Sequence, residues 1–517
     1  MLEHLEPQNE VESVKSASTS SMGAETVDPG LAPCAKRARF APPSTTAHAV
    51  EGEVAELIGR ARAAQRVIED ATQESIDLII RAITFAVCRE PIAEEIARIC
   101  VKETQLGNFE GKLAKIKTKT RAALLDIIDD RSVGEIGRDK ERELVLIAKP
   151  VGVVGATSPS TNPEATPVIK AINAIKGRNA IVIAPHPRAK HTNKIIVDYM
   201  RAALETIGYP ADLIVNIDEP TKPKVEALMR QCDLAWATGG CAMVRRAYSS
   251  GTPALGVGQG NACIYIDRSA DLSLAADCIR RSKTFDLAAS CSSDNCLLAD
   301  KRVYNDLVAE LQKQGGYVVE HERDKESLAT VIWTPTGALN ASAVVKPATE
   351  IARLAGFSIP SDRTFLIIKE DSVGPSFPFS GEKLSVVLAL FKVDGVDEAI
   401  RLTNEIHHYQ GQGHSAGVFS TCKDTSLKFA VGTQTSRVMV NQPQSLSNSG
   451  ALWNGMRQTL SLGCGTWGGT STTENVYWRH LVNITYMSSP LETPKQIPGD
   501  EELFRGVPME AIMKAAP

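Results

Sequence analysis

The 517-residue sequence lacks any apolar run approaching the roughly 18–20 residues that a membrane-spanning helix requires. It also lacks an excess of one charge, because 57 Lys and Arg stand against 61 Asp and Glu without a long basic block. These absences exclude a membrane partner and argue against nucleic acid as the main partner. The first residues, MLEHLEPQNE, lack the charged and apolar regions of a secretory signal, so we expect a cytoplasmic protein.

Cysteine pairs with C-x-x-C spacing are absent too, although the chain holds 11 cysteines. An odd number without metal-ligand spacing predicts reduced, mostly buried thiols rather than a disulfide framework or a zinc site. The adjacent His407 and His408 are interpreted as solvated or capping side chains, because no carboxylate or cysteine completes a metal site around them. We therefore expect no bound metal and at most one or two chemically active thiols.

Aromatic residues make up only 5% of the chain, and residues 1–50 contain one, Phe40, and no Ile. This segment is rich in Ser, Thr, Ala and Pro, and it is predicted to be a disordered N-terminal extension. Its basic cluster, Lys36-Arg37-Ala38-Arg39, is interpreted as a solvated patch, with a nuclear-targeting signal as the alternative.

From about Val50 the pattern is that of a folded protein. The helical spacing of Val54, Leu57, Ile58 and Ala61 predicts that helices begin the fold and continue to about residue 130. Beyond Leu144, short apolar runs alternate with helical segments, which predicts a parallel, doubly wound α/β sheet that binds ligands at the carboxyl ends of its strands. The predicted strands are 144–148, 152–156, 180–184, 213–217, 234–238 and 262–267, and then 296–299, 364–368, 386–390, 416–420 and 438–440.

Two loops contain candidate catalytic groups. Cys291 lies in Phe285-Asp-Leu-Ala-Ala-Ser-Cys-Ser-Ser-Asp-Asn295, where small neighbours would let a carbonyl substrate reach a thiolate; a quiet loop cysteine is the alternative. Asn162 follows a predicted strand and precedes a helix. It could cap that helix, with Pro163 at the first helical position, or its amide could donate to a developing oxyanion.

Three glycine-rich segments are candidates for close backbone approach to a ligand. They are Thr238-Gly239-Gly240, Gly256-Val-Gly-Gln-Gly-Asn261 and Ser461-Leu-Gly-Cys-Gly-Thr-Trp-Gly-Gly-Thr470. The first two could admit a pyrophosphate at a helix N-terminus, but neither matches G-x-G-x-x-G at a strand–helix turn. The third could line a pocket or mark a tight packing point.

Taken in order, these segments resemble the aldehyde dehydrogenase superfamily, and most closely its coenzyme A-acylating branch, over about residues 51–500. The resemblance rests on Lys149-Pro-Val-Gly-Val-Val-Gly155, Thr161-Asn-Pro163, Lys176-Gly-Arg-Asn179, Ala247-Tyr-Ser-Ser-Gly-Thr-Pro-Ala254, the Cys291 loop, Gly411-Gln-Gly-His414 and the 461–469 loop. It implies an α/β fold with a doubly wound NAD-binding domain at 51–285, of which 140–150 contribute to oligomerisation. An α/β catalytic domain at 286–460 would follow, and then a return to the core, an oligomerisation element and a C-terminal tail at 461–517.

The resemblance also implies roles for individual residues. Cys291 would attack the aldehyde, hydride would pass to NAD, and an enzyme thioester would remain. Asn162 and the backbone N–H of Cys291 would stabilise the oxyanion, and His414 would lie near the active site. Glu382 would contact the nicotinamide ribose. Further residues would line the dinucleotide site, namely Thr157, Pro159, Thr238, Gly239 and Gly258.

Two departures from the hydrolytic branch bear on the reaction. Hydrolytic members carry Glu-Leu-Gly-Gly, whose glutamate activates water, whereas this chain has Gly256-Val-Gly-Gln259. Without that base, water attack loses about 10²–10⁴-fold, while a thiol of pKa about 8.5 is partly ionised near neutrality. Transfer to coenzyme A is therefore expected, with the hydrolytic reaction and a silent scaffold as alternatives. Ala184-Pro-His-Pro187 replaces a lysine that binds the adenosine ribose, which favours NAD over NADP.

The Cys-Ser-Ser-Asp-Asn run resembles members that act on sulfoacetaldehyde, and related members take acetaldehyde or propionaldehyde. A sulfonate would need a cation, for which Arg437 and Arg457 are candidates, with surface or structural ion pairs as the alternative. The resemblance implies a homodimer or homotetramer. Some relatives occupy bacterial microcompartments, but the N-terminal apolar residues Leu2, Leu5, Val11 and Val14 form a poor amphipathic face, so this location is the alternative to the cytoplasm.

Overall fold

The computed structural model describes residues 45–515. The basic cluster at 36–39, the apolar residues at 2–14 and most of the predicted extension lie outside this range. Helix α1 (Thr45–Ile68) begins five residues before the predicted end of the extension at residue 50. No helix among the described residues is long and apolar enough to cross a membrane.

Helices begin the fold, as predicted, and continue to residue 128. Ile76, Ile79, Ile80 and Ile83 lie at helical spacing on one fully buried face of α2. The Thr72 side chain accepts a hydrogen bond from the Ser75 N–H and caps this helix. After α2 (Gln73–Cys88) the chain forms α3 (Ile92–Thr104), α4 (Phe109–Ala114), the π-helical turn η1 (Lys115–Lys119) and α5 (Thr120–Ile128).

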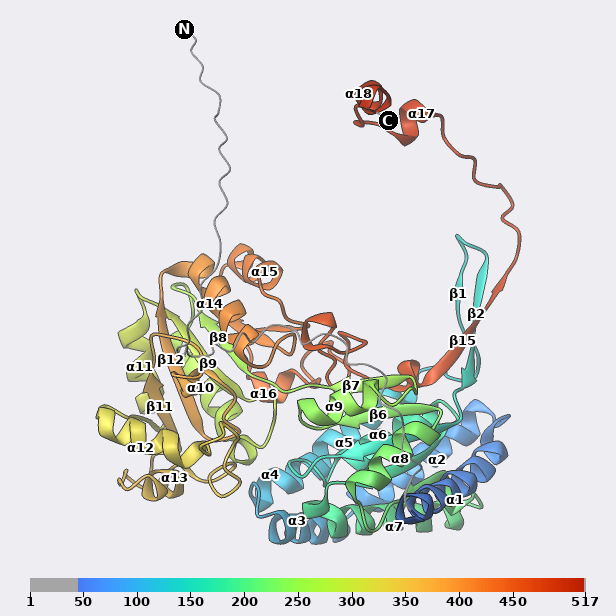
Figure 1. Ribbon diagram of the computed structural model, residues 1–517, viewed down its shortest axis with the longest axis horizontal. Helices are drawn as coiled ribbons and strands as arrows, with labels where there is room; N and C mark the ends of the chain where they lie inside the picture. The colour runs from blue at the N-terminus through green and yellow to red at the C-terminus, as the bar shows by residue number, and fades with distance from the viewer. Residues whose placement is uncertain (1–44, 516–517) are drawn as a thin grey trace, which may run out of the picture. The chain divides into compact units, whose positions relative to one another are not determined.

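A five-stranded parallel sheet follows, with helices packed against it (Figure 1). Its order is β5-β4-β3-β6-β7, so the direction of strand addition reverses at β3 and places the carboxyl ends of β3 and β6 side by side. The strands are β3 (Val153–Ser158), β4 (Ala180–Pro185), β5 (Ile214–Asn216), β6 (Leu234–Thr238) and β7 (Ala254–Val257). The helices between them are α6 (Thr166–Lys176), α7 (Lys190–Thr206), α8 (Lys222–Gln231) and α9 (Cys241–Tyr248).

A second parallel sheet has seven strands in the order β10-β11-β12-β9-β8-β13-β14. They are β8 (Ala262–Ile266), β9 (Asp294–Asp300), β10 (Gly316–Val318), β11 (Phe365–Lys369), β12 (Val387–Val393), β13 (Ala416–Phe419) and β14 (Val438–Val440). The associated helices are α10 (Leu272–Thr284), α11 (Tyr304–Lys313), α12 (Glu322–Ile332), α13 (Ala348–Leu354), α14 (Gly395–Tyr409), α15 (Lys423–Gly432) and α16 (Gln444–Ser447).

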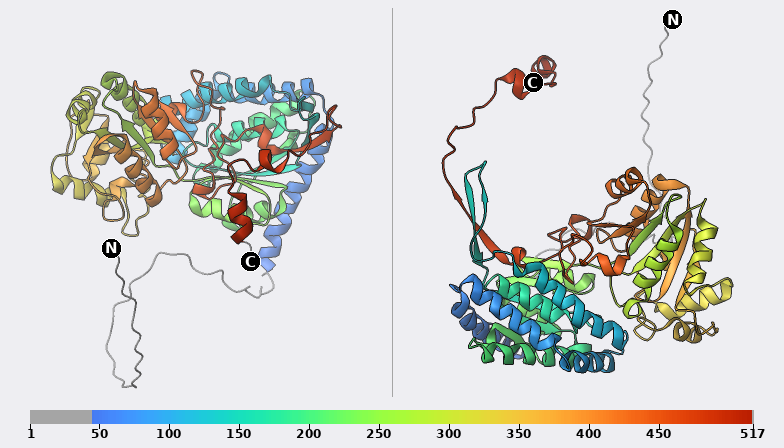
Figure 2. Two further views of the ribbon diagram at one scale, coloured as in Figure 1. Left: turned by 90° about the horizontal axis from the view of Figure 1, so that it is seen from above. Right: turned by 180° about the vertical axis from the view of Figure 1, so that it is seen from behind.

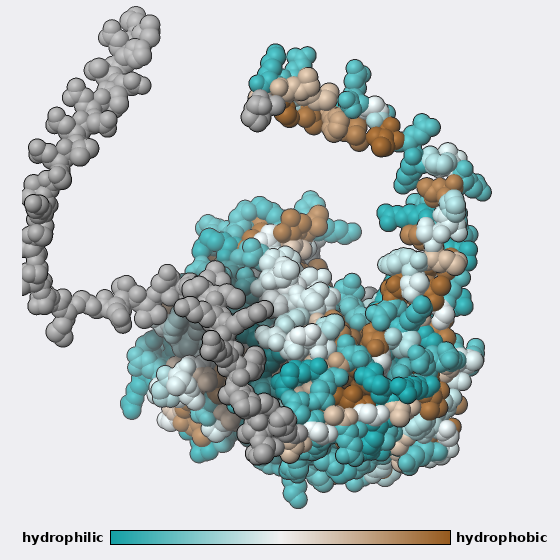
Figure 3. Space-filling model, turned by 45° about the vertical axis from the view of Figure 1, so that its right-hand side comes forward, coloured by the Kyte–Doolittle hydropathy of each residue, from teal (hydrophilic) through white to brown (hydrophobic). Residues whose placement is uncertain are grey.

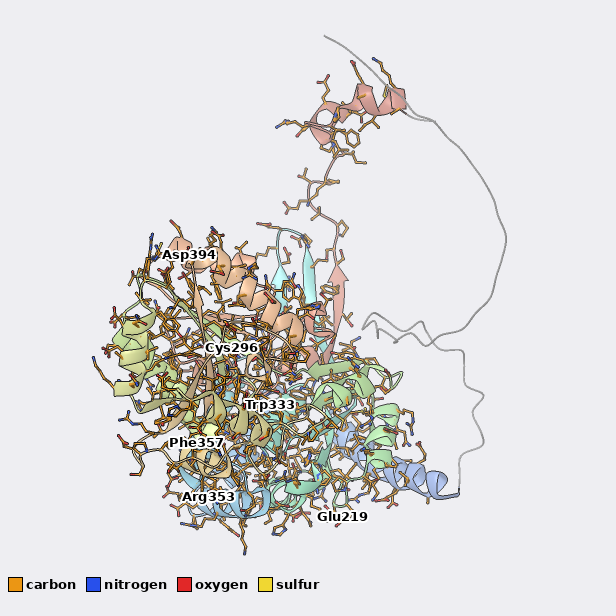
Figure 4. All side chains as sticks on the ribbon, turned by 60° about the vertical axis from the view of Figure 1, so that its left-hand side comes forward. Glu219, Cys296, Trp333, Arg353, Phe357 and Asp394 are labelled. Carbon is orange, nitrogen blue, oxygen red and sulfur yellow. The ribbon has the colours of Figure 1, made fainter. Side chains whose placement is uncertain are left out.

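Central strands of this sheet are buried on both faces, which explains why they read as continuous apolar runs. Cys296 on β9 is fully buried, whereas Arg353 and Asp394, labelled with it in Figure 4, lie at the surface. The chain passes from one sheet to the other between β7 and β8. Strand β8 and helix α10 fall within the predicted 51–285 domain, yet they belong to the seven-stranded sheet, because β8 pairs with β9 and β13.

A third, three-stranded antiparallel sheet joins distant parts of the sequence (Figure 2). Its order is β1-β2-β15, formed by β1 (Gly134–Asp139), β2 (Leu144–Pro150) and β15 (Val482–Ser488). Beyond it lie the short helices α17 (Asp500–Leu503) and α18 (Met509–Ala515). The C-terminal segment exposes apolar side chains, brown in Figure 3, which include Leu503, Phe504, Ile512 and Met513.

The fully buried Asn179 side chain connects this small sheet to the five-stranded sheet. Its Oδ1 accepts hydrogen bonds from the Val151 and Gly152 N–H groups at 2.8 and 3.0 Å. Its Nδ2 donates to the carbonyls of Ala174 and Leu481 at 3.1 and 2.8 Å. One side chain therefore satisfies backbone groups before β3, in α6 and before β15.

Replacing Asn179 by Ala should lower the free energy of unfolding by about 2–4 kcal/mol, because several buried backbone groups lose their partner. Denaturant unfolding followed by circular dichroism measures this change. Asn305→Ala on the exposed side of α11 is the matched control and should change stability by less than about 0.5 kcal/mol. Equal stability of the two variants would contradict the role given to Asn179.

Candidate active site

The structure places Cys291 next to His414. Cys291 lies in the loop between the 3-10 turn η4 (Phe285–Ala288) and β9, and His414 lies just before β13. The Cys291 Sγ is 3.2 Å from the His414 Nε2, and the His414 Nδ1 is 2.9 Å from the Ser415 Oγ. An imidazole with its proton on Nδ1 can donate to Ser415 and accept the thiol proton at Nε2.

Burial keeps both members of this pair uncharged. It raises the pKa of the Cys291 thiol to about 12, and the Glu382 carboxyl adds to this effect. Burial also lowers the pKa of His414 to about 3, with the Arg437 guanidinium as a further cause. At neutral pH the two groups are therefore a thiol and a neutral imidazole, and His414 is placed as a proton acceptor for Cys291.

Glycines allow the backbone to pack tightly around the cysteine. A Cβ on Gly260 would lie 1.8 Å from the Cys291 carbonyl oxygen, so no larger residue fits there without displacing the loop. A Cβ on Gly413 would lie 1.9 Å from the Cys464 carbonyl oxygen. The 461–469 loop therefore packs against the turn that carries His414, the second of the two predicted interpretations of this loop.

Asn162 does not cap a helix, so that part of the prediction is wrong. Helix α6 begins at Thr166, and the backbone carbonyl of Asn162 accepts from the Thr166 N–H at 3.1 Å. The side-chain Oδ1 of Asn162 instead accepts from the Lys115 ammonium at 2.6 Å, and its Nδ2 lies 3.2 Å from the Thr161 Oγ1. Lys115 thus fixes which end of the amide is oxygen and leaves the NH₂ as the group that can donate to a ligand.

Behind Asn162 lies a buried cluster of two ammonium and two carboxylate groups, which the motifs did not indicate. Lys112 lies 3.0 Å from Asp286 and 3.5 Å from Glu164, and Lys115 contacts the same two carboxylates. The two positive charges of this cluster match its two negative charges. The ammonium groups hold the pKa of Asp286 below its ordinary value despite its burial. The sequence signal was the spacing of Lys112, Lys115 and Lys119 on a helix whose other face is apolar.

Asp286 also holds a strained turn ahead of Cys291. Asp286, Leu287 and Ala288 have φ values of 46°, 54° and 64°, a left-handed conformation that costs non-glycine residues about 1–3 kcal/mol each. The Asp286 carboxylate accepts from the Asn108 N–H at 2.9 Å and from Lys115. The charge cluster therefore fixes both the Asn162 amide and the turn that leads to the cysteine.

A cavity of about 300 Å³ opens beside these groups. Asn162 and Ser290, the residue before Cys291, line it together with Phe285. The other lining residues belong to the segment 445–460 and to the helix formed by η1 and α5, and they include Lys119. This cavity extends to Asn162 and to the residue next to Cys291, and it has the size of a site for a small molecule.

The predicted dinucleotide-binding residues lie at the carboxyl ends of β3, β6 and β7. The Thr157 Oγ1 donates to the Thr238 carbonyl at 3.0 Å and accepts from the Thr238 N–H at 2.8 Å, which joins two strand ends. Pro159 follows β3, Gly239 precedes the N-terminus of α9, and Gly258 follows β7. Among the described residues, the buried Ser158 Oγ and Thr238 Oγ1 have no hydrogen-bond partner, so polar groups remain for a ligand at this switch point.

Glu382 contacts the segment between β7 and β8, which itself packs against Cys291. Burial raises its pKa to about 7, while hydrogen bonds from the Gln259 side chain and the Gly260 backbone oppose this shift. Its backbone N–H donates to the Gln410 Oε1 at 2.9 Å. The carboxyl lies close enough to Cys291 to raise the pKa of its thiol.

Other candidate side chains have structural contacts. Arg437 is buried and donates to the carbonyls of His414 and Gly463, and Arg457 pairs with Asp126 and Asp130. Neither arginine lines the cavity. Arg457 forms the ion pairs of the alternative, whereas Arg437 is held by backbone carbonyls. His407 is not solvated, because it is 1% exposed and its Nε2 lies 3.1 Å from the Asn261 carbonyl. Burial lowers its pKa to about 4.

The chain belongs to the aldehyde dehydrogenase family. A family model with that description matches residues 34–355. The chain is 42% identical over 445 residues to a protein of Bilophila wadsworthia named sulfoacetaldehyde dehydrogenase (acylating), over 85% of this chain and 95% of the relative. It is 36% identical over 456 residues to a protein of Clostridium kluyveri named succinate-semialdehyde dehydrogenase (acetylating), over 88% and 99% of the two chains.

Among solved structures, the fold matches that of an acetylating aldehyde dehydrogenase from Geobacillus thermoglucosidasius. The TM-score is 0.83 at 38% identity, over 87% of this chain and 99% of that chain. The resemblance to the acylating branch of the family, and with it the predicted α/β fold class, is therefore confirmed.

The tight contact at Gly260 yields one prediction. Gly260→Ala should lower the free energy of unfolding by about 1–3 kcal/mol, because the new Cβ overlaps the Cys291 carbonyl. Denaturant unfolding measures this change. Gly59→Ala in α1 is the control, since its Cβ meets nothing within 4 Å and should not destabilise the protein. The interpretation fails if Gly260→Ala is as stable as the control.

The contact between Cys291 and His414 yields a second prediction. His414→Gln should slow alkylation of Cys291 by iodoacetamide at neutral pH by about 100-fold, because a buried thiol loses its proton acceptor. Mass spectrometry of the Cys291 peptide over time measures the rate. His408→Gln, at the exposed neighbour on α14, should leave it unchanged. An unchanged rate in His414→Gln would show that His414 does not take this proton.

Proposed function

We propose that this chain oxidises a short-chain aldehyde with NAD and transfers the acyl group to coenzyme A through a thioester on Cys291. The carrying observation is the composition of the site: Cys291 contacts His414, whereas the segment beside it, Gly256-Val-Gly-Gln259, offers no carboxylate to activate water. Glu382 is held by hydrogen bonds to Gln259 and Gly260.

The residues would act in sequence. His414 takes the thiol proton as Cys291 Sγ attacks the aldehyde carbon, and the Asn162 Nδ2 with the Cys291 N–H stabilises the oxyanion of the thiohemiacetal. Loss of hydride from that carbon leaves the thioester. The thiol of coenzyme A then displaces Cys291 and gives an acyl-CoA, with His414 as the proton carrier.

The dinucleotide, when bound, supplies the hydride acceptor. Thr157, Pro159, Thr238, Gly239 and Gly258 would hold it at the ends of β3, β6 and β7, and Glu382 would contact the nicotinamide ribose. The switch point between β3 and β6, with its unpartnered Ser158 and Thr238 hydroxyls, supports this assignment. The names of the acylating relatives support the reaction class.

Two alternatives use the same fold. A hydrolytic enzyme would release a carboxylate, and a silent scaffold would do no chemistry. The absence of a carboxylate at 256–259 argues against the first, and the retained contact between Cys291 and His414 argues against the second.

Mixing enzyme, aldehyde and NAD without coenzyme A should give a burst of about one NADH per active site and then stop, because the thioester lacks an acceptor. Adding coenzyme A should restore turnover and yield acyl-CoA, measured by absorbance at the NADH band and by mass spectrometry. Cys291→Ala should show neither burst nor turnover. Full-rate NADH production without coenzyme A would establish hydrolysis instead, and no NADH from any short aldehyde would leave only a scaffold.

Assembly and location are part of the proposal. β15 is an edge strand of the three-stranded sheet and exposes Tyr486 and Met487, which supports a homodimer or homotetramer formed through this element. We place the enzyme in the cytoplasm, with a bacterial microcompartment as the alternative. We also retain the dinucleotide role for the five-stranded sheet and the catalytic role for the seven-stranded sheet.

A further inference from the structure

One cation in the cavity beside Asn162 has no role in the reaction as proposed. Lys119 lines this cavity together with Lys115, Thr118 and Ala122, which share one face of the helix formed by η1 and α5. Lys115 binds Asn162 at the reacting centre. Lys119 lies one turn further on, about 6 Å along the helix axis.

The two lysines differ in how their charge is balanced. Lys115 contacts Glu164 and Asp286. The Lys119 ammonium is instead held by neutral oxygens: the Ser449 carbonyl at 2.8 Å, the Gln458 Oε1 at 2.9 Å, and the Gly450 carbonyl. Within residues 45–515, no carboxylate forms an ion pair with it.

The carboxylate that acts on Lys119 from a distance, Asp126, is already occupied. It lies 3.5 Å from the Arg457 guanidinium and accepts a hydrogen bond from the Gln458 N–H. Burial accordingly lowers the pKa of Lys119 to about 7, with Asp126 opposing the shift only in part. A buried ammonium of this kind gains stability when an anion enters its surroundings.

The rest of the cavity is suited to a short carbon chain. Phe285, Leu446 and Leu460 supply apolar walls, and the exposed side chains of Leu452 and Trp453 lie where the cavity meets solvent. A ligand with its carbonyl at Asn162 and a chain of a few carbons would bring its far end to Lys119.

We propose that Lys119 binds an anionic group at the far end of the aldehyde, so that the substrate class is short aldehydes bearing a sulfonate or a carboxylate. This inference rests on the proposed function, because it assumes that the carbonyl is bound at Asn162 and Cys291. Lys119 thereby replaces Arg437 and Arg457 as the candidate cation for the anionic end of the substrate. Sulfonate and carboxylate share the charge that Lys119 recognises, and their comparison belongs to the test.

The test compares anionic aldehydes (sulfoacetaldehyde and succinate semialdehyde) with neutral ones (propionaldehyde and butyraldehyde). The parent enzyme should have a higher kcat/KM for at least one anionic aldehyde than for both neutral ones. In Lys119→Met, kcat/KM for the preferred anionic aldehyde should fall about 100-fold, while the values for neutral aldehydes change less than about threefold. Lys119→Arg, which keeps the charge, should retain the preference.

Lys117→Met is the matched control. It removes a lysine from the same π-helical turn, but Lys117 pairs with Glu90 and does not line the cavity, so the preference should be unchanged. Binding of ethanesulfonate and of succinate, measured by calorimetry, should weaken in Lys119→Met and not in the control. The stronger of the two ligands tells sulfonate from carboxylate recognition.

Several outcomes would overturn the proposal. A parent enzyme with a higher kcat/KM for the neutral aldehydes than for the anionic ones would overturn it. An equal loss for all four aldehydes in Lys119→Met would show that Lys119 only holds the carbonyls of residues 449 and 450. If Lys119→Met does not fold, Lys119→Gln keeps two hydrogen-bond donors and takes its place. Failure of the parent to form acyl-CoA from any of the four aldehydes would instead contradict the proposed function.

Discussion

The bridge from the Lys115 ammonium to Asn162 and Asp286 is the interaction on which the site depends. It joins three segments that are far apart in the sequence: the π-helical turn, the loop after β3 and the turn before Cys291. The charge of Lys115 orients a neutral amide on one side and anchors a left-handed turn on the other. A single buried cation thus sets the relative positions of the proposed nucleophile loop and the proposed oxyanion donor. The carboxylates of Glu164 and Asp286 offset the free energy of burying this cation, and removing either one would leave a buried charge without its partner.

Around this bridge, burial determines the protonation of the reacting groups. Cys291 and His414 stay neutral because an ion pair between them would have to be desolvated, and Glu382 nearby favours the protonated thiol further. The nucleophile is therefore protected at rest. Its reaction therefore needs a proton acceptor within contact distance, which the structure supplies in His414.

Much of the fold could be predicted, because its strands are buried on both faces. The predicted ranges of β6 and β14 agree with the structure at both ends, since apolar runs between turn residues identify such strands well. β15 was not predicted, because an exposed edge strand with Asn483 and Thr485 has no apolar run. The predicted domain boundary after residue 285 leaves β8 in the first domain, whereas the structure pairs β8 with β9 in the seven-stranded sheet. The amino-acid composition gives no sign of that pairing.

The candidate site was predictable only where the chemistry is local. Cys291, Asn162 and His414 stand in short, recognisable segments, and the structure brings Cys291 and His414 into contact. The lysines were not predicted, because a lysine on an amphipathic helix is ordinarily solvated. Their partners lie 47 and 171 residues away in the chain, and only the packed structure shows that the polar stripe of this helix is covered.

The π-helical turn at Lys115–Lys119 has a consequence for sequence divergence. Such a turn accommodates one residue more than a regular helix over the same span. Loss of a single residue there would convert it to an ordinary α-helical turn over the same span, so that α4 and α5 could keep their places. The lysines that correspond to Lys115 and Lys119 would then be three residues apart and would still point in nearly the same direction. A one-residue gap within this turn, in a relative that still has the cysteine, would therefore be compatible with an unchanged cavity and an unchanged choice of aldehydes.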